Sequence, residues 1–180
     1  MQISPGTQLV WSLSGSEAVN LGMPKIEPDH LYCALLKFVE LNDETIARLL
    51  TNSSEAPAVC EERDDLAPKF KDLPNSTTEI RHAVRKEAEH GTHKLEGNLI
   101  HRSDISRKIF EKAIEMANKE DSPTYPTHLL QVLMESPTPA MKTSFMPDPS
   151  ARAAAARRSR HGPARCRTPR SARECRPAAR

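Results

Sequence analysis

Apolar residues follow helical spacing most clearly in the segment 28–39. Leu31, Leu35 and Phe38 fall on one face, and further apolar residues lie beside them. Side chains three and four positions apart share a face of an α-helix, so the pattern predicts a mostly buried helix. Pro28 fits its first position, where the missing N–H has no helical partner to lose.

The same pattern returns near the end of the apolar part of the chain. Residues 26–36 are matched by residues 124–134, with Pro126, His128 and Leu129 in the places of the earlier proline, histidine and leucine. Upstream of both copies, Glu17 and Asn20 correspond to Glu115 and Asn118 at the same spacing. Self-similarity at a fixed period is typical of repeated structural units, so the sequence predicts two copies of one helical unit.

Further helices are predicted on either side of these two. Gly22 suits the left-handed residue that ends a helix. Ser76-Thr77-Thr78-Glu79 has the pattern of a capping box, in which the first and last side chains satisfy backbone N–H groups of the first turn. Residues 1–8 are expected to be a frayed start, Gly91 to follow the end of a helix, and 90–102 to be a connector. The additional predicted helices are 9–21, 44–51, part of 52–75, 80–89 and 105–118.

Composition narrows the fold class. Aromatic residues make up only 4% of the chain, and the mean hydropathy is −0.60. The core must then be built from aliphatic side chains, which favours an all-α fold over a β-sandwich. No apolar run is long enough for a transmembrane helix, and no secretory signal is visible. The four cysteines form no CxxC pair, so we expect a reducing, cytoplasmic setting and no membrane association.

The last part of the chain has a different character. Residues 151–180 hold ten arginines and one glutamate, whereas the preceding residues carry an excess of acidic groups that brings the whole chain to +2. No Leu, Ile, Val, Phe, Tyr or Trp follows Met146, so this part has little apolar surface to bury. We therefore predict a helical domain over 1–146 and a disordered Arg/Ala/Pro-rich tail over 147–180. The abrupt change also suggests an out-of-frame ending on a truncated gene.

The two histidines of the repeated motif have a structural and a functional interpretation. His30 and His128 each occupy about the third helical position, where an imidazole can accept a hydrogen bond from an exposed backbone N–H. Catalysis or metal binding is the alternative. The pair His90 and His93 lacks acidic or thiol partners at ligand spacing. No phosphate-binding GxxxxGK[ST] loop and no GxSxG motif occur. The sequence thus predicts a non-enzymatic protein with no cofactor and no metal.

These motifs together resemble a known family. Leu21-Gly22 followed by Ile26-Glu27-Pro28-Asp29-His30-Leu31 and Ala34-Leu35-Leu36 is similar to the first repeat of the N-terminal domain of Clp-type AAA+ unfoldases. His101-Arg102-Ser103, Phe110-Glu111-Lys112-Ala113 and Thr127-His128-Leu129-Leu130 resemble the second repeat. The resemblance covers about residues 5–145.

The resemblance implies a fold of two pseudo-symmetric four-helix repeats, the double Clp-N motif. In that family the domain is tethered to ATPase rings and recognises substrates or adaptor proteins, without catalytic residues of its own. Some relatives bind phosphorylated arginine through an acidic residue just before the histidine of each repeat. The corresponding positions are Asp29 and Thr127, of which only the first is a carboxylate. The ATPase modules of the family are missing from this sequence.

The function expected from the sequence is protein recognition for a Clp-type ATP-dependent unfoldase, protease or chaperone system. The candidate binding residues are Asp29, His30, Thr127 and His128, at helix N-termini that offer free N–H groups to an anionic or polar ligand. We expect the binding site to lie mainly at the first repeat, because Asp29 is a carboxylate and Thr127 is not. Two alternatives remain: a nucleic-acid-binding regulator that uses weak, nonspecific anion contacts of the basic tail, and a gene fragment without function.

Overall fold

The computed structural model describes residues 2–92 and 100–144, and these residues are mostly helical. The predicted all-α class is confirmed at that level. The predicted tail and part of the 90–102 connector lie outside the described residues, so the domain boundary stays a prediction. The elements in chain order are α1 Pro5–Asn20, β1 Lys25–Ile26, α2 Pro28–Glu40, α3 Asp43–Leu49, η1 Ser53–Glu55, α4 Ala56–Leu66, η2 Ala67–Phe70, α5 Thr77–Glu87, β2 His101–Arg102, α6 Asp104–Lys119, α7 Pro126–Glu135 and α8 Pro139–Ser144. None of the described helices is long and apolar enough to cross a membrane.

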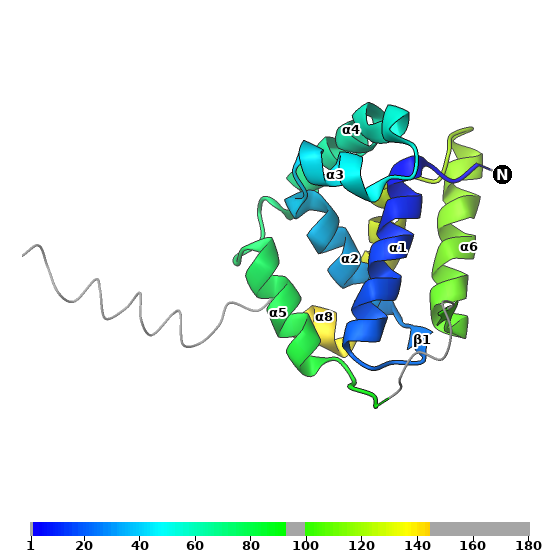
Figure 1. Cartoon of the computed structure of the whole chain (residues 1–180). Coiled ribbons are helices and arrows are strands. Elements are labelled where there is room, and N and C mark those ends of the chain that lie inside the picture. Colours follow the sequence, from blue (N-terminus) through cyan, green and yellow to red (C-terminus); the bar gives the residue numbers. More distant parts are fainter. Residues whose placement is uncertain (1, 93–99, 145–180) are drawn as a thin grey trace, which may run out of the picture. The chain divides into compact units, whose positions relative to one another are not determined.

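Helix α2 is the centre of the core. It lies between α1 and α5, with α6 beyond α1 (Figure 1), and it also contacts α4, α7 and α8. Its side chains Leu31, Tyr32, Leu35, Leu36 and Phe38 are all fully buried. A helix that is apolar nearly all round is stable in water only when other helices cover it. The prediction of a buried helix at this position is confirmed.

Helix α1 begins earlier than expected. The predicted frayed start is wrong from Pro5 onward, because Ser4 is an N-cap whose Oγ accepts a hydrogen bond from the Thr7 N–H at 3.2 Å. Pro5 follows at the first helical position, which a proline favours. Glu62 of α4 strengthens this start, since its buried carboxylate accepts from Ser4 Oγ at 2.6 Å and from the Gly6 N–H at 3.2 Å.

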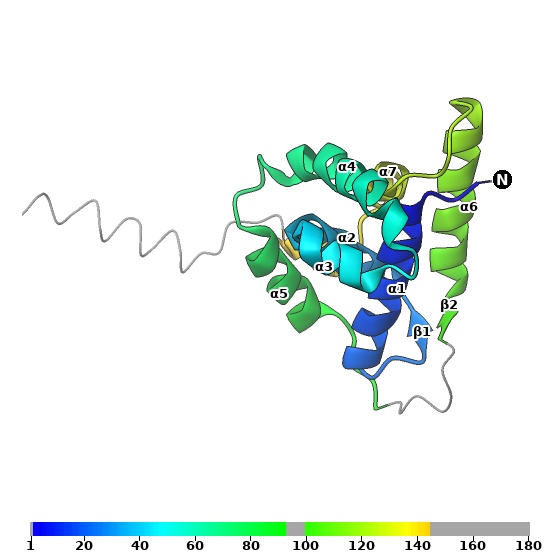
Figure 2. The ribbon, with the colours of Figure 1, turned by 45° about the horizontal axis from the view of Figure 1, so that its top comes forward.

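Two short parallel pairings, which the sequence analysis missed, join segments far apart in the chain. Strand β1 pairs with β2 (Figure 2), and an isolated bridge joins Ile3 to Thr124. The Ser4 N–H donates to the Thr124 carbonyl at 3.1 Å, and the Ser103 N–H donates to the Ile26 carbonyl at 3.0 Å. Each pairing is only one or two residues long, too short for an alternating pattern to appear in the sequence.

Other local predictions have mixed outcomes. Ser76 and Glu79 form the expected capping box at the start of α5, but the helix ends at Glu87, with Ala88 already extended. The segment 52–75 contains α4, as expected in part. The predicted helix 44–51 corresponds to α3, in which Ile46 is buried and Leu49 is 49% exposed. Helix α8, which begins at Pro139, was not predicted.

Gly22 and Gly91 lie against each other and close the end of the molecule at which α1 and α5 finish. Gly22 has φ +65°, the left-handed conformation predicted for it, and the Met23 N–H returns to the Ala18 carbonyl at 2.9 Å. The Gly91 N–H donates to the Leu21 carbonyl at 2.9 Å. A Cβ on Gly22 would overlap the Gly91 carbonyl oxygen. Gly91 is therefore a packing partner of Gly22 rather than a helix terminator.

Replacing Gly22 by alanine is expected to lower the free energy of unfolding by about 2 kcal/mol, from the left-handed backbone and the overlap together. Urea unfolding followed by far-UV circular dichroism measures this. The control is Gly15→Ala inside α1, where a Cβ would come no closer than 3.3 Å, to Ile100. A loss for Gly22→Ala no larger than that of the control would contradict the proposed role of the contact.

Candidate functional site

The N-termini of α2 and α7 have the same cap, and in both it is a histidine. The Glu27 N–H donates to His30 Nδ1 at 2.9 Å, and the Tyr125 N–H donates to His128 Nδ1 at 3.0 Å. Both imidazoles are buried, at 2% and 6% exposure. The structural interpretation of these histidines is confirmed: each satisfies a backbone N–H that the first helical turn leaves without a partner.

The caps also assign the tautomer of each ring. An Nδ1 that accepts a hydrogen bond carries no proton, so the neutral ring is protonated at Nε2. Burial lowers the pKa of His30 to about 4, against a smaller opposing effect of Glu17. His128 Nε2 lies 3.0 Å from Glu120 Oε2, which accepts a hydrogen bond from its N–H. No described residue is hydrogen-bonded to His30 Nε2. The two rings therefore differ: Glu120 accepts from Nε2 of His128, while Nε2 of His30 has no such partner among the described residues.

Asp29 is half-buried one position before His30. Its Oδ1 accepts a hydrogen bond from Thr138 Oγ1, and the same hydroxyl accepts from the Met141 N–H at 3.1 Å in the first turn of α8. Burial raises the pKa of Asp29, the Thr138 hydrogen bond opposes this, and Glu27 and Glu89 raise it further. A carboxylate with a raised pKa is stabilised by any cation that approaches it.

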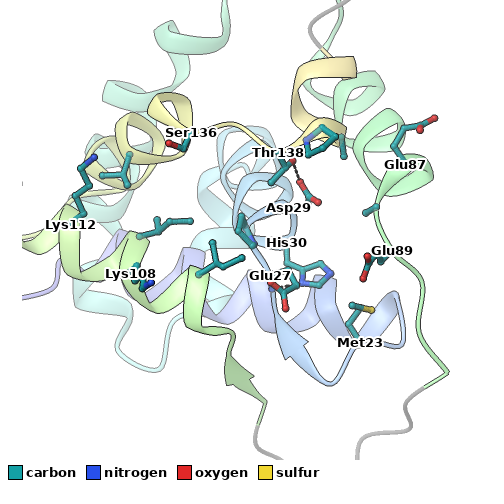
Figure 3. A pocket seen from close by; sticks show the side chains of 17 residues that line it. Met23, Glu27, Asp29, His30, Glu87, Glu89, Lys108, Lys112, Ser136 and Thr138 are labelled. Atoms are coloured by element: carbon teal, nitrogen blue, oxygen red, sulfur yellow. Dashed lines mark hydrogen bonds between the residues drawn. The ribbon is translucent and has the colours of Figure 1, made fainter.

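A groove of about 660 Å³ opens beside Asp29 and His30 (Figure 3). It is bordered by the start of α2, the end of α5, the first half of α6 and the segment that joins α7 to α8. Apolar side chains of α6 and α7 line it, among them Ile105, Ile109 and Val132. Ile105 is 61% exposed, the largest value among the exposed large apolar residues of the described part.

Two of the four predicted site residues line this groove, and two do not. Asp29 and His30 belong to its wall, whereas Thr127 and His128 are absent from it. The sequence analysis did not include the charged groove residues Glu27, Glu87, Glu89, Lys108 and Lys112, or Thr138. Nothing in the sequence signals their convergence, because they come from four segments that meet only in the folded chain.

Other chemistry has little support among the described residues. Within 2–92 and 100–144, no group of three or more His, Cys, Asp or Glu side chains could hold a metal ion. His90 lies with Nε2 2.9 Å from the Arg85 carbonyl oxygen, and His93 falls outside the described residues. Burial raises the pKa of the Cys33 thiol to about 12, which keeps it protonated and unreactive near neutral pH.

Comparison with known proteins adds no assignment. No protein-family model matches the chain, and no curated protein matches it. What the chain does must accordingly be argued from its own residues and from the groove they form.

Proposed function

We propose that this chain is a non-enzymatic protein-recognition domain of the Clp type, built from two pseudo-symmetric repeats. It binds short segments of substrate or adaptor proteins in the groove beside Asp29. It serves a cytoplasmic system driven by the ATPase ring of an AAA+ partner. The groove carries the proposal, because it combines apolar side chains, of which Ile105 is exposed, with charged groups of both signs.

The exchange of contacts between the two halves supports the pair of repeats. The segment that precedes α1 pairs with the segment that precedes α7, and the segment that precedes α2 pairs with the one that precedes α6. Ser4 and Ser103, the N-caps of α1 and α6, donate equivalent hydrogen bonds to Thr124 and Ile26. Such reciprocal contacts are what an isologous, two-fold arrangement of similar units produces.

An aromatic contact lies where the two halves meet. Counted from the N-caps, Trp11 in α1 and Phe110 in α6 hold the same position, and their rings meet edge to face with centroids 5.4 Å apart. Arg102 lies 5.2 Å from both ring centroids. A residue that touches its own counterpart lies near a local two-fold axis, which agrees with the proposed repeats.

The dimensions and lining of the groove suit a peptide segment. Binding clefts for small ligands are about 300–1,000 Å³, mostly apolar, with a few polar groups that fix orientation. A volume of about 660 Å³ falls in this range. The proposal places the ligand beside the first copy of the repeated motif and not at the second, because Thr127 offers no carboxylate and does not line the groove.

An Ile105→Asp substitution is expected to weaken binding of an unfolded protein about tenfold, through loss of apolar contact. The probe is fluorescein-labelled casein, and fluorescence anisotropy measures its affinity for the full chain. Stability should change little, because Ile105 is exposed. The matched control is Leu49→Asp, a 49% exposed leucine that does not line the groove. Equal affinities of the two variants, or no binding by the unaltered chain, would refute the proposed function.

A further inference from the structure

Charges of opposite sign face each other across the groove. Four carboxylates lie at the start of α2 and the end of α5, and two lysines project from α6 on the opposite side (Figure 3). Ile105, Ile109 and Val132 form the apolar strip of the same lining, of which Ile105 is exposed and Val132 buried. Lys112 pairs with Glu135. Lys108 is exposed and has no ion-pair partner in the described part of the chain. The carboxylates are Glu27, Asp29, Glu87 and Glu89.

His30 lies on the acidic side of the groove with one ring nitrogen available to a ligand. Its Nδ1 is occupied by the helix cap, and no described residue accepts a hydrogen bond from its Nε2–H, although the ring lines the groove. A polar group of this kind in a mostly apolar groove fixes the orientation of a ligand that supplies an acceptor. The surrounding carboxylates repel an anionic acceptor and leave a neutral carbonyl as the better match.

We propose that the groove selects a protein segment whose charges are arranged in the order basic, apolar, acidic. The basic end meets the carboxylates of α2 and α5, and a main-chain carbonyl beside it accepts from His30 Nε2. The apolar middle covers the strip of α6 and α7, and the acidic end meets Lys108. This inference rests on the proposed function and adds the chemistry of its ligand.

Complementary charges in the groove determine which segment is preferred more than they raise the affinity for any one segment. Exposed pairs contribute about 0.2–1 kcal/mol each, and their effect is screened beyond about 8 Å at physiological salt. A segment that places like charges at either end meets repulsion and unpaired groups, which disfavours it relative to the matched segment. Two charges at each end are enough for a measurable preference.

The test uses fluorescein-labelled peptides of one apolar core: KKGLVLGEE, KKGLVLGKK, EEGLVLGEE and QQGLVLGQQ. Anisotropy titrations with the full chain should give the highest affinity for KKGLVLGEE. Replacing either charged end by the opposite charge should weaken binding about threefold to tenfold. Raising the salt concentration should reduce these differences. Affinities that do not depend on the charge pattern would overturn the inference.

Charge reversal in the groove separates specific pairing from general attraction. Lys108→Glu should shift the preference to KKGLVLGKK, and the double variant Glu87→Lys/Glu89→Lys should shift it to EEGLVLGEE. Lys119→Glu, on the same helix but outside the groove, should leave the order unchanged. Every variant carries the same residues 151–180, so the contribution of that segment cancels in these comparisons.

The outcomes distinguish the two proposals. If Ile105→Asp weakens peptide binding but no reversal changes the preferred peptide, the groove is a recognition site without charge selection, and only this inference fails. If none of the four peptides and no casein binds, both proposals fail. A shift of preference in both groove variants, and none in Lys119→Glu, establishes the charge order.

Discussion

An Arg85→Ala variant should lose about 3 kcal/mol of unfolding free energy, the typical effect of breaking a buried ion pair. Glu17 on α1 is fully buried, and both of its carboxylate oxygens accept from Arg85 on α5, at 2.8 and 2.6 Å. Removing the guanidinium leaves a buried carboxylate without its partner, and the protein must then either bury that charge or protonate it. Urea unfolding at neutral pH measures the loss.

Two further variants make this result interpretable. Arg107→Ala removes an arginine from a solvent-exposed pair with Asp104, which is 3.7 Å away, and should change stability by less than about 1 kcal/mol. Adding Glu17→Gln to Arg85→Ala should recover part of the loss, because a neutral amide is easier to bury than a carboxylate. If Arg85→Ala proves no more destabilising than Arg107→Ala, the buried pair contributes little.

The same ion pair connects stability to the groove. Arg85 lies in the last turn of α5, directly before Glu87 and Glu89, which form one wall. Fixing this turn to Glu17 therefore fixes the position of that wall relative to α1 and α2. A weakened pair should reduce binding of KKGLVLGEE as well as stability, because the acidic side of the groove would no longer be held in place.

The features predicted correctly are those that neighbouring residues determine. The structural interpretation of His30 and His128 as caps follows from helix position alone, which brings an N3 side chain back to the N-cap N–H. Gly22 and the Ser76 capping box are local in the same sense. The start at Ser4-Pro5 was missed although its residues are good helix initiators, because residues 1–8, which include Pro5 and Gly6, were expected to be frayed.

Features that depend on distant residues could not be predicted. The repeat alignment placed Glu17 opposite Glu115, but counting from Ser4 and Ser103 places it opposite Met116, since the connection after α6 is one residue shorter. The burial of Glu17 and its pairing with Arg85 gave no sequence signal. The walls of the groove likewise come from α2, α5 and α6, which only tertiary packing brings together.

Acidification should destabilise the unaltered chain more than a His30→Gln variant, by about 3 kcal/mol when pH falls from 7 to 4. The pKa of His30 is lowered from 6.5 to about 4 in the folded chain. Between these values the unfolded chain binds a proton that the folded chain does not, so the stabilisation present above pH 6.5 is lost as the pH falls. Glutamine at this capping-box position can still accept the Glu27 N–H, and it does not titrate.

The comparison between the two chains isolates His30 because the other titrating groups are the same in both. Glu17 faces His30 and favours its charged form, while the pKa of Asp29 and of Glu62 is raised by burial. Protonating those two carboxyls relieves an unfavourable burial and acts in the opposite direction, so the unaltered chain alone would show only the net effect. Thermal or urea unfolding at several pH values measures both chains. If the unfolding free energies of the two chains changed with pH in parallel, His30 would have the same pKa in the folded and unfolded states. Burial would then not lower its pKa, and the prediction would be wrong.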